Sequence, residues 1–223
     1  QIYDTVDIVC AAAILYLLRG QRADGCIPDR VQVDGRAVYS AGPADAPLGD
    51  PPTDNAQFMV HLVYAYAQQS GDWNFARQHL DALCRAMDGV PRSPAGLVVI
   101  PPGRRQSPYG FTDTVAKRGE LCFSSLLYWM AARELADLCA RASSSPPCSV
   151  RGGLRGCESW RERAAQIEAA MPRLWDAKAG AYRAATETCY QVDVWASAHA
   201  VYIGFAQGEQ RQRLLEFLRD SYG

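Results

Sequence analysis

The sequence has little of what most metal, phosphate and nucleic-acid sites require. It contains only three histidines, and its eight cysteines form no Cys-x-x-Cys pair and no Cys/His cluster at zinc-ligand spacing. A Gly-x-Ser-x-Gly motif and a glycine-rich phosphate loop ahead of a helix are also missing. Lys and Arg number 23 against 24 Asp and Glu, so there is no basic excess to bind a phosphate backbone. We therefore expect no metal, no cofactor and no nucleic-acid partner.

Long hydrophobic runs are missing as well. The longest one covers residues 8–18 and is too short to span a bilayer, so we expect no membrane span. The composition, 48% hydrophobic and 21% charged, is ordinary for a globular protein and unlike that of a disordered chain. Because the chain begins with Gln1 rather than Met, we expect a processed protein or a fragment, and the sequence does not indicate its compartment.

The cysteines have a plain structural interpretation. Four of them lie inside apolar helical patterns, where a free cysteine packs like a small hydrophobic residue: Cys10, Cys84, Cys122 and Cys139. Cys148 and Cys157 flank a loop and would pair only in an oxidising compartment.

Helical periodicity dominates the chain. Apolar residues recur every three or four positions over most of its length, whereas strand patterns are few. The predicted helices cover 4–19, 54–69, 75–87, 113–141, 160–174, a stretch from 193 to the turn at Gly208, and 210–219. A low-complexity insert occupies 143–156, and short extended pieces are expected at 96–100 and 176–182. We expect one domain over 1–223.

Four of these helices open on an aspartate, namely Asp4, Asp54, Asp113 and Asp193. Helix pairs repeated at intervals of this size predict stacked helical hairpins, and long loops on one side, following the inner helices, fit a ring of hairpins around a central pocket. The predicted fold is therefore all-α, an α/α toroid of the (α/α)6 kind. We count about four of its six hairpins, so we expect an incomplete ring.

In such a ring the N-terminal ends of the inner helices meet around one mouth, which could bring carboxylates together. Glycoside hydrolysis requires two of them, one to protonate the leaving oxygen and one to activate water. The plain alternative is that each aspartate only caps its helix, because its side chain accepts hydrogen bonds from the first turn. Asp54 and Gln57 even have the spacing of a capping box.

The segment from Tyr109 to Glu120 is the richest candidate site. Asp113, Lys117 and Glu120 would share one face of a helix, just upstream of a strongly apolar stretch. A solvated salt-bridge stripe is the plain alternative. If this face lines a pocket, Asp113 is the better catalytic candidate and Glu120 the second.

Asp193 is followed two residues later by Trp195, which combines a carboxylate with an indole. Sugar sites use such pairs, with the ring stacked on the sugar and the acid bound to its hydroxyls. Core packing of Trp195 is an equally good interpretation. Asp29 and Arg30 lie on the first long loop and could border the same pocket or form an ion pair.

Four segments resemble the bacterial-type six-hairpin glycosidases. They are Thr-Asp-Asn-Ala-Gln-Phe at 53–58, Gln-Ser-Gly-Asp at 69–72, Leu-Trp-Asp-Ala-Lys-Ala-Gly-Ala-Tyr at 174–182 and Val-Asp-Val-Trp-Ala-Ser-Ala at 192–198. The resemblance implies an (α/α)6 barrel that hydrolyses glycosidic bonds, commonly with inversion. It also implies that Asp54, Asp113 and Asp193 stand where such proteins place catalytic or substrate-binding acids.

The leading hypothesis is a glycoside hydrolase, or a fragment of one, that acts on an oligosaccharide or glycoside. Asp113 would be the general acid, with Asp193 or Glu120 as its partner. The substrate-binding residues would be Asp54, Asn55, Trp195, Tyr109, Asp29 and Arg30. The alternatives are a non-catalytic α/α module that binds glycans or proteins, and another toroid enzyme such as a sugar epimerase or polysaccharide lyase, for which histidine or tyrosine bases would be expected in the pocket.

Overall fold

The computed structural model describes residues 2–47, 49–100, 117–143 and 153–222. Within these ranges the chain forms seven α-helices and three small antiparallel strand pairs. The helices are α1 (Ile2–Leu18), α2 (Asn55–Ser70), α3 (Trp73–Asp88), α4 (Cys122–Ser143), α5 (Gly153–Ala170), α6 (Val194–Tyr202) and α7 (Gly208–Tyr222). A 3-10 turn, η1 (Met171–Leu174), extends α5. None of these helices is both long and apolar enough to cross a bilayer.

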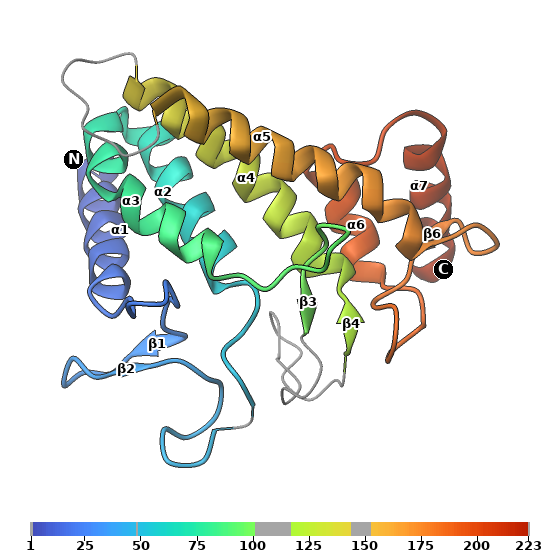
Figure 1. The fold of residues 1–223 in the computed structure, drawn as a ribbon, viewed down its shortest axis with the longest axis horizontal. Helices are drawn as coiled ribbons and strands as arrows, with labels where there is room; N and C mark the ends of the chain where they lie inside the picture. The colour runs from blue at the N-terminus through green and yellow to red at the C-terminus, as the bar shows by residue number, and fades with distance from the viewer. Residues whose placement is uncertain (1, 48, 101–116, 144–152, 223) are drawn as a thin grey trace.

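The helices form two rows. In the inner row α4 packs against both α2 and α6, while α3 and α5 pack on α4 and α7 packs on α6 from the outer row (Figure 1). Each inner helix is followed directly by its outer partner, which makes three hairpins: α2–α3, α4–α5 and α6–α7. Helix α1 packs beside α2 at one end of the row. This is the all-α arrangement of stacked hairpins that the sequence predicts.

Helix α4 is the centre of the molecule. Most of its side chains are buried on all sides, among them the fully buried Leu126, Leu127, Tyr128 and Leu135. A helix that is buried over most of its surface needs several neighbours, and α4 has them in α2, α3, α5 and α6. The main core is therefore continuous through the three hairpins.

Short-range sequence features determine the turn of the α2–α3 hairpin. Helix α2 ends at Gly71, whose φ of 75° is the left-handed value that favours glycine at a helix C-terminus. Asp72 then caps α3 by accepting a hydrogen bond from the Phe75 N–H at 3.0 Å. The buried residues of α3 recur at helical spacing on one face: Ala76, Leu80, Leu83, Ala86 and Met87. A two-residue connection thus turns the chain back on itself.

The connections differ at the two ends of the helices. Short turns join α2 to α3 and α6 to α7, whereas long connections precede α2, α4 and α6 (Figure 1). These long connections carry the strand pairs β1 (Arg30–Val31) with β2 (Ala37–Val38), β3 (Val99–Ile100) with β4 (Gly119–Glu120), and β5 (Trp175–Asp176) with β6 (Ala181–Tyr182). The irregular structure is therefore concentrated where the inner helices begin.

The described structure corrects three expectations. It contains three hairpins and the single helix α1 rather than about four hairpins. Helix α1 begins at Ile2, so Asp4 lies in its first turn and does not open it. Helix α5 begins at Gly153, which makes the end of the expected 143–156 insert helical, while 144–152 lie outside the described residues.

Helix α4 begins at Cys122 and not at Asp113. Gly119 has a φ of 81°, which is not compatible with a right-handed helix, and the Leu121 N–H donates to the Val98 carbonyl at 2.8 Å. This segment is therefore extended and pairs with β3. Lys117 and Glu120 therefore do not lie on a helix, and the expectation of a shared helix face is wrong for these two residues. Asp113, the third residue of the expected face, lies outside the described residues.

Candidate functional site

Contacts at the N-terminal end of α4 join it to the N-terminal ends of α2 and α6, its neighbours in the inner row. On one side the hydroxyls of Thr53 and Ser124 lie 2.9 Å apart and are buried. On the other side Lys117 Nζ lies 3.2 Å from Asp193 Oδ2. Thr53 stands just before α2 and Asp193 just before α6, so the N-terminal ends of α2, α4 and α6 meet at one end of the molecule.

Asp193 is a buried, fully engaged carboxylate. Its side chain accepts a hydrogen bond from the Ala196 N–H at 2.9 Å, which confirms the expectation that it caps its helix. The Asp193 and Lys117 side chains are only 9% and 7% exposed, so the pair is largely removed from water. Nearby, burial together with the charge of Asp193 raises the pKa of the fully buried Cys122 thiol well above its ordinary value.

Trp195 lies on the first turn of α6 and is 51% exposed. Core packing of this side chain, one of the two interpretations of the sequence, is therefore wrong. Tyr190, three residues before Asp193, is 59% exposed. Two aromatic side chains thus remain accessible close to the buried acid.

Asp54 is 2% exposed and stands directly before α2, but its side chain makes no capping hydrogen bond to the first turn. The expected capping box with Gln57 is not formed, because Gln57 Nε2 instead donates to the Thr53 carbonyl at 2.7 Å. Asn55, the first residue of α2, donates to the Ile27 carbonyl at 3.3 Å. The start of α2 is therefore held by its neighbours rather than by a local cap.

Glu120 is held between the outer elements. Its carboxylate accepts a hydrogen bond from Ser93 Oγ at 2.7 Å and pairs with Arg173 Nε at 2.9 Å. Ser93 follows α3 and Arg173 lies in η1 after α5, so both partners come from connections that leave outer helices. The Glu120 side chain is 8% exposed whereas that of Arg173 is 60% exposed. This environment differs from that of Asp193, which faces the inner row.

Asp29 and Arg30 form the ion pair that the sequence offered as one of two interpretations, with 2.9 Å between Oδ2 and Nη1. Arg30 also donates to the carbonyls of Ser40 and Gly42, so it fastens the connection that carries β1 and β2. Tyr109, like Asp113, lies outside the described residues.

A cavity of about 230 Å³ opens beside the start of α2. Its polar lining includes Arg22, Asp24, Thr53 and Asn55, and its apolar lining comes from residues such as Ile27, Pro51, Pro52, Ala56 and Val90. Hydrophobic walls with a few fixed polar groups are typical of small-molecule sites. Among the expected site residues that the structure describes, Asn55 is the one that contributes to this cavity.

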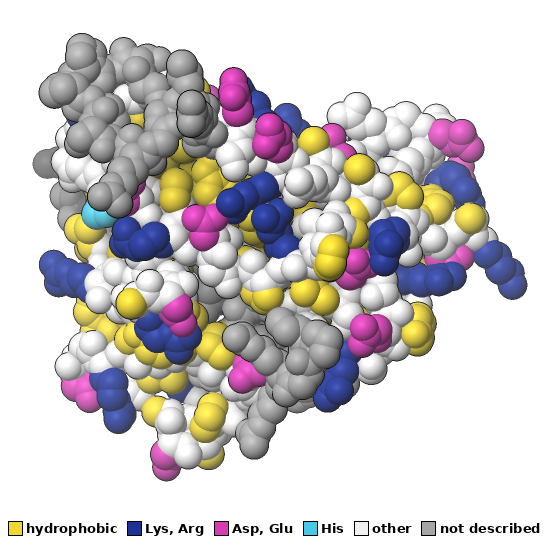
Figure 2. Space-filling view, viewed as in Figure 1, with side chains coloured by type: hydrophobic (Ala, Val, Ile, Leu, Met, Phe, Trp, Pro, Cys, Tyr) yellow, Lys and Arg dark blue, Asp and Glu magenta, His cyan; other side chains and the backbone are white. Residues whose placement is uncertain are grey.

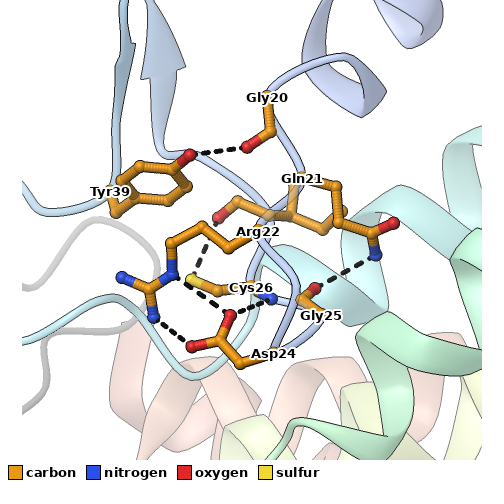
Figure 3. A network of polar contacts seen from close by, with 8 residues as sticks. Gly20, Gln21, Arg22, Asp24, Gly25, Cys26 and Tyr39 are labelled. Carbon is orange, nitrogen blue, oxygen red and sulfur yellow. Dashed lines mark hydrogen bonds and ion pairs between the residues drawn. The ribbon is translucent and has the colours of Figure 1, made fainter.

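The wall formed by residues 20–26 is a connected polar network (Figure 3). Arg22 binds both carboxylate oxygens of Asp24, at 3.1 and 2.5 Å, and its guanidinium also lies over the Tyr39 ring. The hydrogen bond from Arg22 lowers the pKa of Asp24, and a further one from the Cys26 N–H adds to this effect. Gly25 has a φ of 88°, and a Cβ there would lie 2.1 Å from the Arg85 carbonyl, so only glycine allows this close approach to α3.

Sequence reasoning missed Arg22, Asp24, Thr53 and Ser124. The Asp24-Gly25 pair is a turn signal that could have drawn attention to the loop. The cavity itself, however, depends on contacts between segments about sixty residues apart, which no local pattern reports.

Two histidines lie on the inner helices. His61 of α2 is 2.7 Å from Glu134 of α4, and this hydrogen bond raises its pKa. His199 of α6 is mostly buried, and desolvation, with a smaller effect of the charge of His61, lowers its pKa to about 4. Among the described residues no group of three His, Cys, Asp or Glu is arranged to hold a metal ion. Basic and acidic side chains are interspersed on the face drawn in Figure 2.

Comparison with known proteins gives structural matches only. No protein-family model matches the sequence, and no curated protein matches it. The fold is similar to that of a rhamnosidase from Klebsiella oxytoca solved with rhamnose bound, with a TM-score of 0.70, 17% identity and 95% of this chain covered. It is also similar to a GH78 family rhamnosidase of Bacillus sp. GL1, with a TM-score of 0.71, 17% identity and 94% of this chain covered.

At this identity the likeness shows the fold alone. The chain spans 37% and 20% of the lengths of these two proteins. It therefore has a glycoside hydrolase-like fold, and corresponds to only part of each matched protein.

Proposed function

We propose that the chain forms part of a glycoside hydrolase that cleaves glycosidic bonds with a pair of carboxylates and inversion at the anomeric carbon. The observation that carries the proposal is the meeting of the N-terminal ends of α2, α4 and α6, joined by the Thr53–Ser124 and Lys117–Asp193 contacts. An acid at such an end is stabilised by the helix dipole and lies where a ring of hairpins would open to solvent. The likeness to two rhamnosidases supports the same class of reaction.

In this proposal Asp113 protonates the leaving oxygen and Asp193 activates the water. Asp193 is the better partner because it belongs to an inner helix and lies beside the exposed Trp195. Glu120 is the weaker candidate, since its partners Ser93 and Arg173 belong to the connections that leave the outer helices, away from the start of α6. Inversion would require the two catalytic carboxyl groups to be about 6.5–9.5 Å apart, with water between them.

The substrate would be a sugar held at the same end. Trp195 offers an indole face for stacking, and Asn55 offers an amide at the edge of the cavity. Asp54 would bind hydroxyl groups, while Tyr109, Asp29 and Arg30 would border the entrance. Because one matched protein was solved with rhamnose, a rhamnoside is the first substrate to test.

The test is hydrolysis of nitrophenyl glycosides, with the rhamnoside first, by the chain and by its Asp113→Asn and Asp193→Asn variants. Both variants should lose hydrolysis by about a hundredfold or more while still binding the free sugar, because an amide keeps the size of the acid but not its proton transfer. Proton NMR of the first product should show the inverted anomer. Sugar binding without hydrolysis by the unaltered chain would instead favour a non-catalytic module.

One observation favours a second candidate, a toroid enzyme that uses a histidine base. A carboxylate that binds one ring nitrogen of a histidine orients the ring, and Glu134 does this for His61 at 2.7 Å. An epimerase or polysaccharide lyase would use such a base to remove a proton from a carbon atom. Release of an unsaturated sugar from an acidic polysaccharide, abolished in His61→Ala, would support this candidate over a hydrolase.

A further inference from the structure

A second cavity, of about 220 Å³, lies between the first turns of α3 and the last turns of α4. Its described lining residues are Trp73, Asn74, Arg77, Leu138, Arg141 and Ala142. Helix α4 starts at Cys122, and at about 1.5 Å of rise per residue Arg141 lies roughly 28 Å further along its axis. The second cavity is therefore at the opposite end of α4 from the candidate site.

The second cavity combines buried apolar groups with positive charge. Leu138 and Ala142 are 4% and 5% exposed and form its apolar part. The charged residues of the described lining are Arg77 and Arg141. None of the described lining residues is acidic, and residues 144–152, which follow α4 in the sequence, contain no Asp or Glu. An anionic ligand therefore fits this cavity better than a cationic one.

Arg141 is held in place by two neighbours. Its Nε donates a hydrogen bond to Asp137 Oδ2 at 2.8 Å, and its guanidinium lies over the Trp73 ring, 4.1 Å from the centroid. Asp137 is fixed in turn, because it accepts a hydrogen bond from the Tyr64 hydroxyl at 3.0 Å. Among the described residues no group accepts a hydrogen bond from Nη1 or Nη2 of Arg141. The terminal nitrogens of a fixed, planar guanidinium are thus available to an acceptor in the cavity.

Arg77 supplies a second guanidinium. Its Nη2 donates to Asn74 Oδ1 one turn earlier on α3, and Asn74 itself lines the cavity. Two positive charges that share so small a cavity repel each other, so an anion bound between them is stabilised by both. A carboxylate suits guanidinium groups because its two oxygens match the parallel N–H donors of the fork.

We propose that the second cavity binds the carboxylate of an acidic sugar between Arg77 and Arg141, with the sugar ring packed against Leu138 and Ala142. Pockets for drug-sized ligands have volumes of about 300 Å³ and more, so the smaller cavity here has room for one sugar residue. The choice of a sugar rests on the proposed function, whereas the preference for a carboxylate rests on the two arginines. The site anchors an acidic glycan at the far end of α4 and takes no part in bond cleavage.

The experiment is an NMR titration of the nitrogen-15-labelled chain with D-galacturonate. It follows the indole N–H signal of Trp73, which is assigned by its absence from Trp73→Phe. The signal should shift and saturate with a dissociation constant of roughly 0.1–10 mM, as expected for so small a ligand. D-Galactose has a hydroxymethyl group in place of the carboxylate, and it should bind at least about tenfold more weakly.

Two variants test the arginines directly. Arg141→Gln and Arg77→Gln should each weaken galacturonate binding about tenfold or more, because each loses charge-assisted hydrogen bonds to the carboxylate. The matched control is Arg133→Gln. Arg133 also lies over a tryptophan of α4, 4.5 Å from the Trp129 centroid, but it does not line the second cavity. This variant should bind galacturonate as the unaltered chain does.

The proposal is overturned if galacturonate causes no saturating shift at Trp73, or if galactose or inorganic phosphate binds as tightly. It is equally overturned if both arginine variants bind galacturonate unchanged. Asp193→Asn should bind galacturonate as the unaltered chain does, because Asp193 lies at the other end of the inner row. Binding at Trp73 without hydrolysis of any glycoside rejects the proposed function alone, whereas hydrolysis without binding at Trp73 rejects this site alone.

Discussion

Lys117 and Asp193 form a buried ion pair that joins the segment ahead of β4 to the residue ahead of α6, with 3.2 Å between Nζ and Oδ2. The two residues are separated by 76 positions in the sequence. Their contact holds the second hairpin against the third at the end where the inner helices begin. The same pair sets the position of the acid that we propose as the water-activating group.

Loss of one member of this pair should be much more harmful than loss of both charges. Lys117→Met removes the cation that lies 3.2 Å from the buried Asp193 carboxylate, and we expect the free energy of unfolding to fall by about 3–5 kcal/mol. Lys117→Met combined with Asp193→Asn should recover most of this loss, because asparagine still accepts the capping hydrogen bond from the first turn of α6. The free energies of unfolding in urea of both single variants and of the double variant give the coupling free energy between the two charges. Strictly additive losses would show that the two charges do not stabilise each other.

Trp195 should contribute to sugar affinity and little to stability. Its indole is half exposed, so Trp195→Ala removes a stacking surface without emptying the core. We expect sugar binding to weaken about 2- to 12-fold, as one aromatic contact provides roughly 0.5–1.5 kcal/mol. Calorimetric titration with the free sugar measures the change. The matched control is Tyr202→Ala at the far end of α6, where the ring is 85% exposed; equal weakening in both variants would remove Trp195 from the site.

His199 should make the fold sensitive to acid. Its pKa in the folded chain is lowered to about 4 from an ordinary 6.5, so the unfolded chain binds the proton first as the pH falls. The stabilisation is therefore complete above pH 6.5 and is lost between about pH 6.5 and 4, by no more than about 3 kcal/mol and less where solvent reaches the ring. His61 acts in the opposite sense, since its pKa is raised by Glu134.

The measurement is the free energy of unfolding at pH 7.5 and pH 5.0 for the unaltered chain and for His199→Gln. Glutamine cannot take up the proton, so the difference between the two pH values should shrink in the variant. An unchanged difference would assign the acid sensitivity to other groups.

Gly25→Ala should distort the cavity wall. Alanine at this position combines an unfavourable positive φ with a Cβ 2.1 Å from the Arg85 carbonyl, and we expect a loss of stability of at least about 2 kcal/mol. Gly35 has a similar φ of 84° but no atom within 4 Å of the corresponding Cβ. Gly35→Ala should therefore cost only about 1–2 kcal/mol, the strain of the backbone alone. Thermal unfolding of the two variants separates the contribution of the close contact, and equal losses would mean that the Gly25 loop moves aside.

The sequence predicts those parts of the molecule that depend on short-range signals. Helices α2 and α3 lie within two residues of their expected ranges, because their apolar spacing and the Gly71-Asp72 turn are both local. The cap by Asp193 is local in the same way. The start of α4 could not be predicted from spacing alone, since the pairing of β4 with β3 and the positive φ of Gly119 override a helical pattern.

The cavity could not be predicted for a related reason. Arg22 and Asp24 become part of a site only because Gly25 approaches Arg85, and Gln21 donates to the Ala82 carbonyl at 2.8 Å. Contacts between segments so far apart do not produce a periodic pattern in the sequence. Residue types therefore predicted which helix starts would lie together, but not the walls of the cavity.

The unequal connections at the two ends of the helices separate two properties on which natural selection acts. The short turns and the buried faces of α3 and α4 determine whether the chain folds, and substitutions there change stability directly. The long connections before α2, α4 and α6 supply polar groups at the N-terminal ends of the inner helices. They can change in length or sequence while the packing of the helices is kept. Exchange of these loops can therefore alter the polar groups at this end of the scaffold, and the loss of stability is greatest at positions such as Gly25 and Lys117, where a loop contacts a helix or another loop.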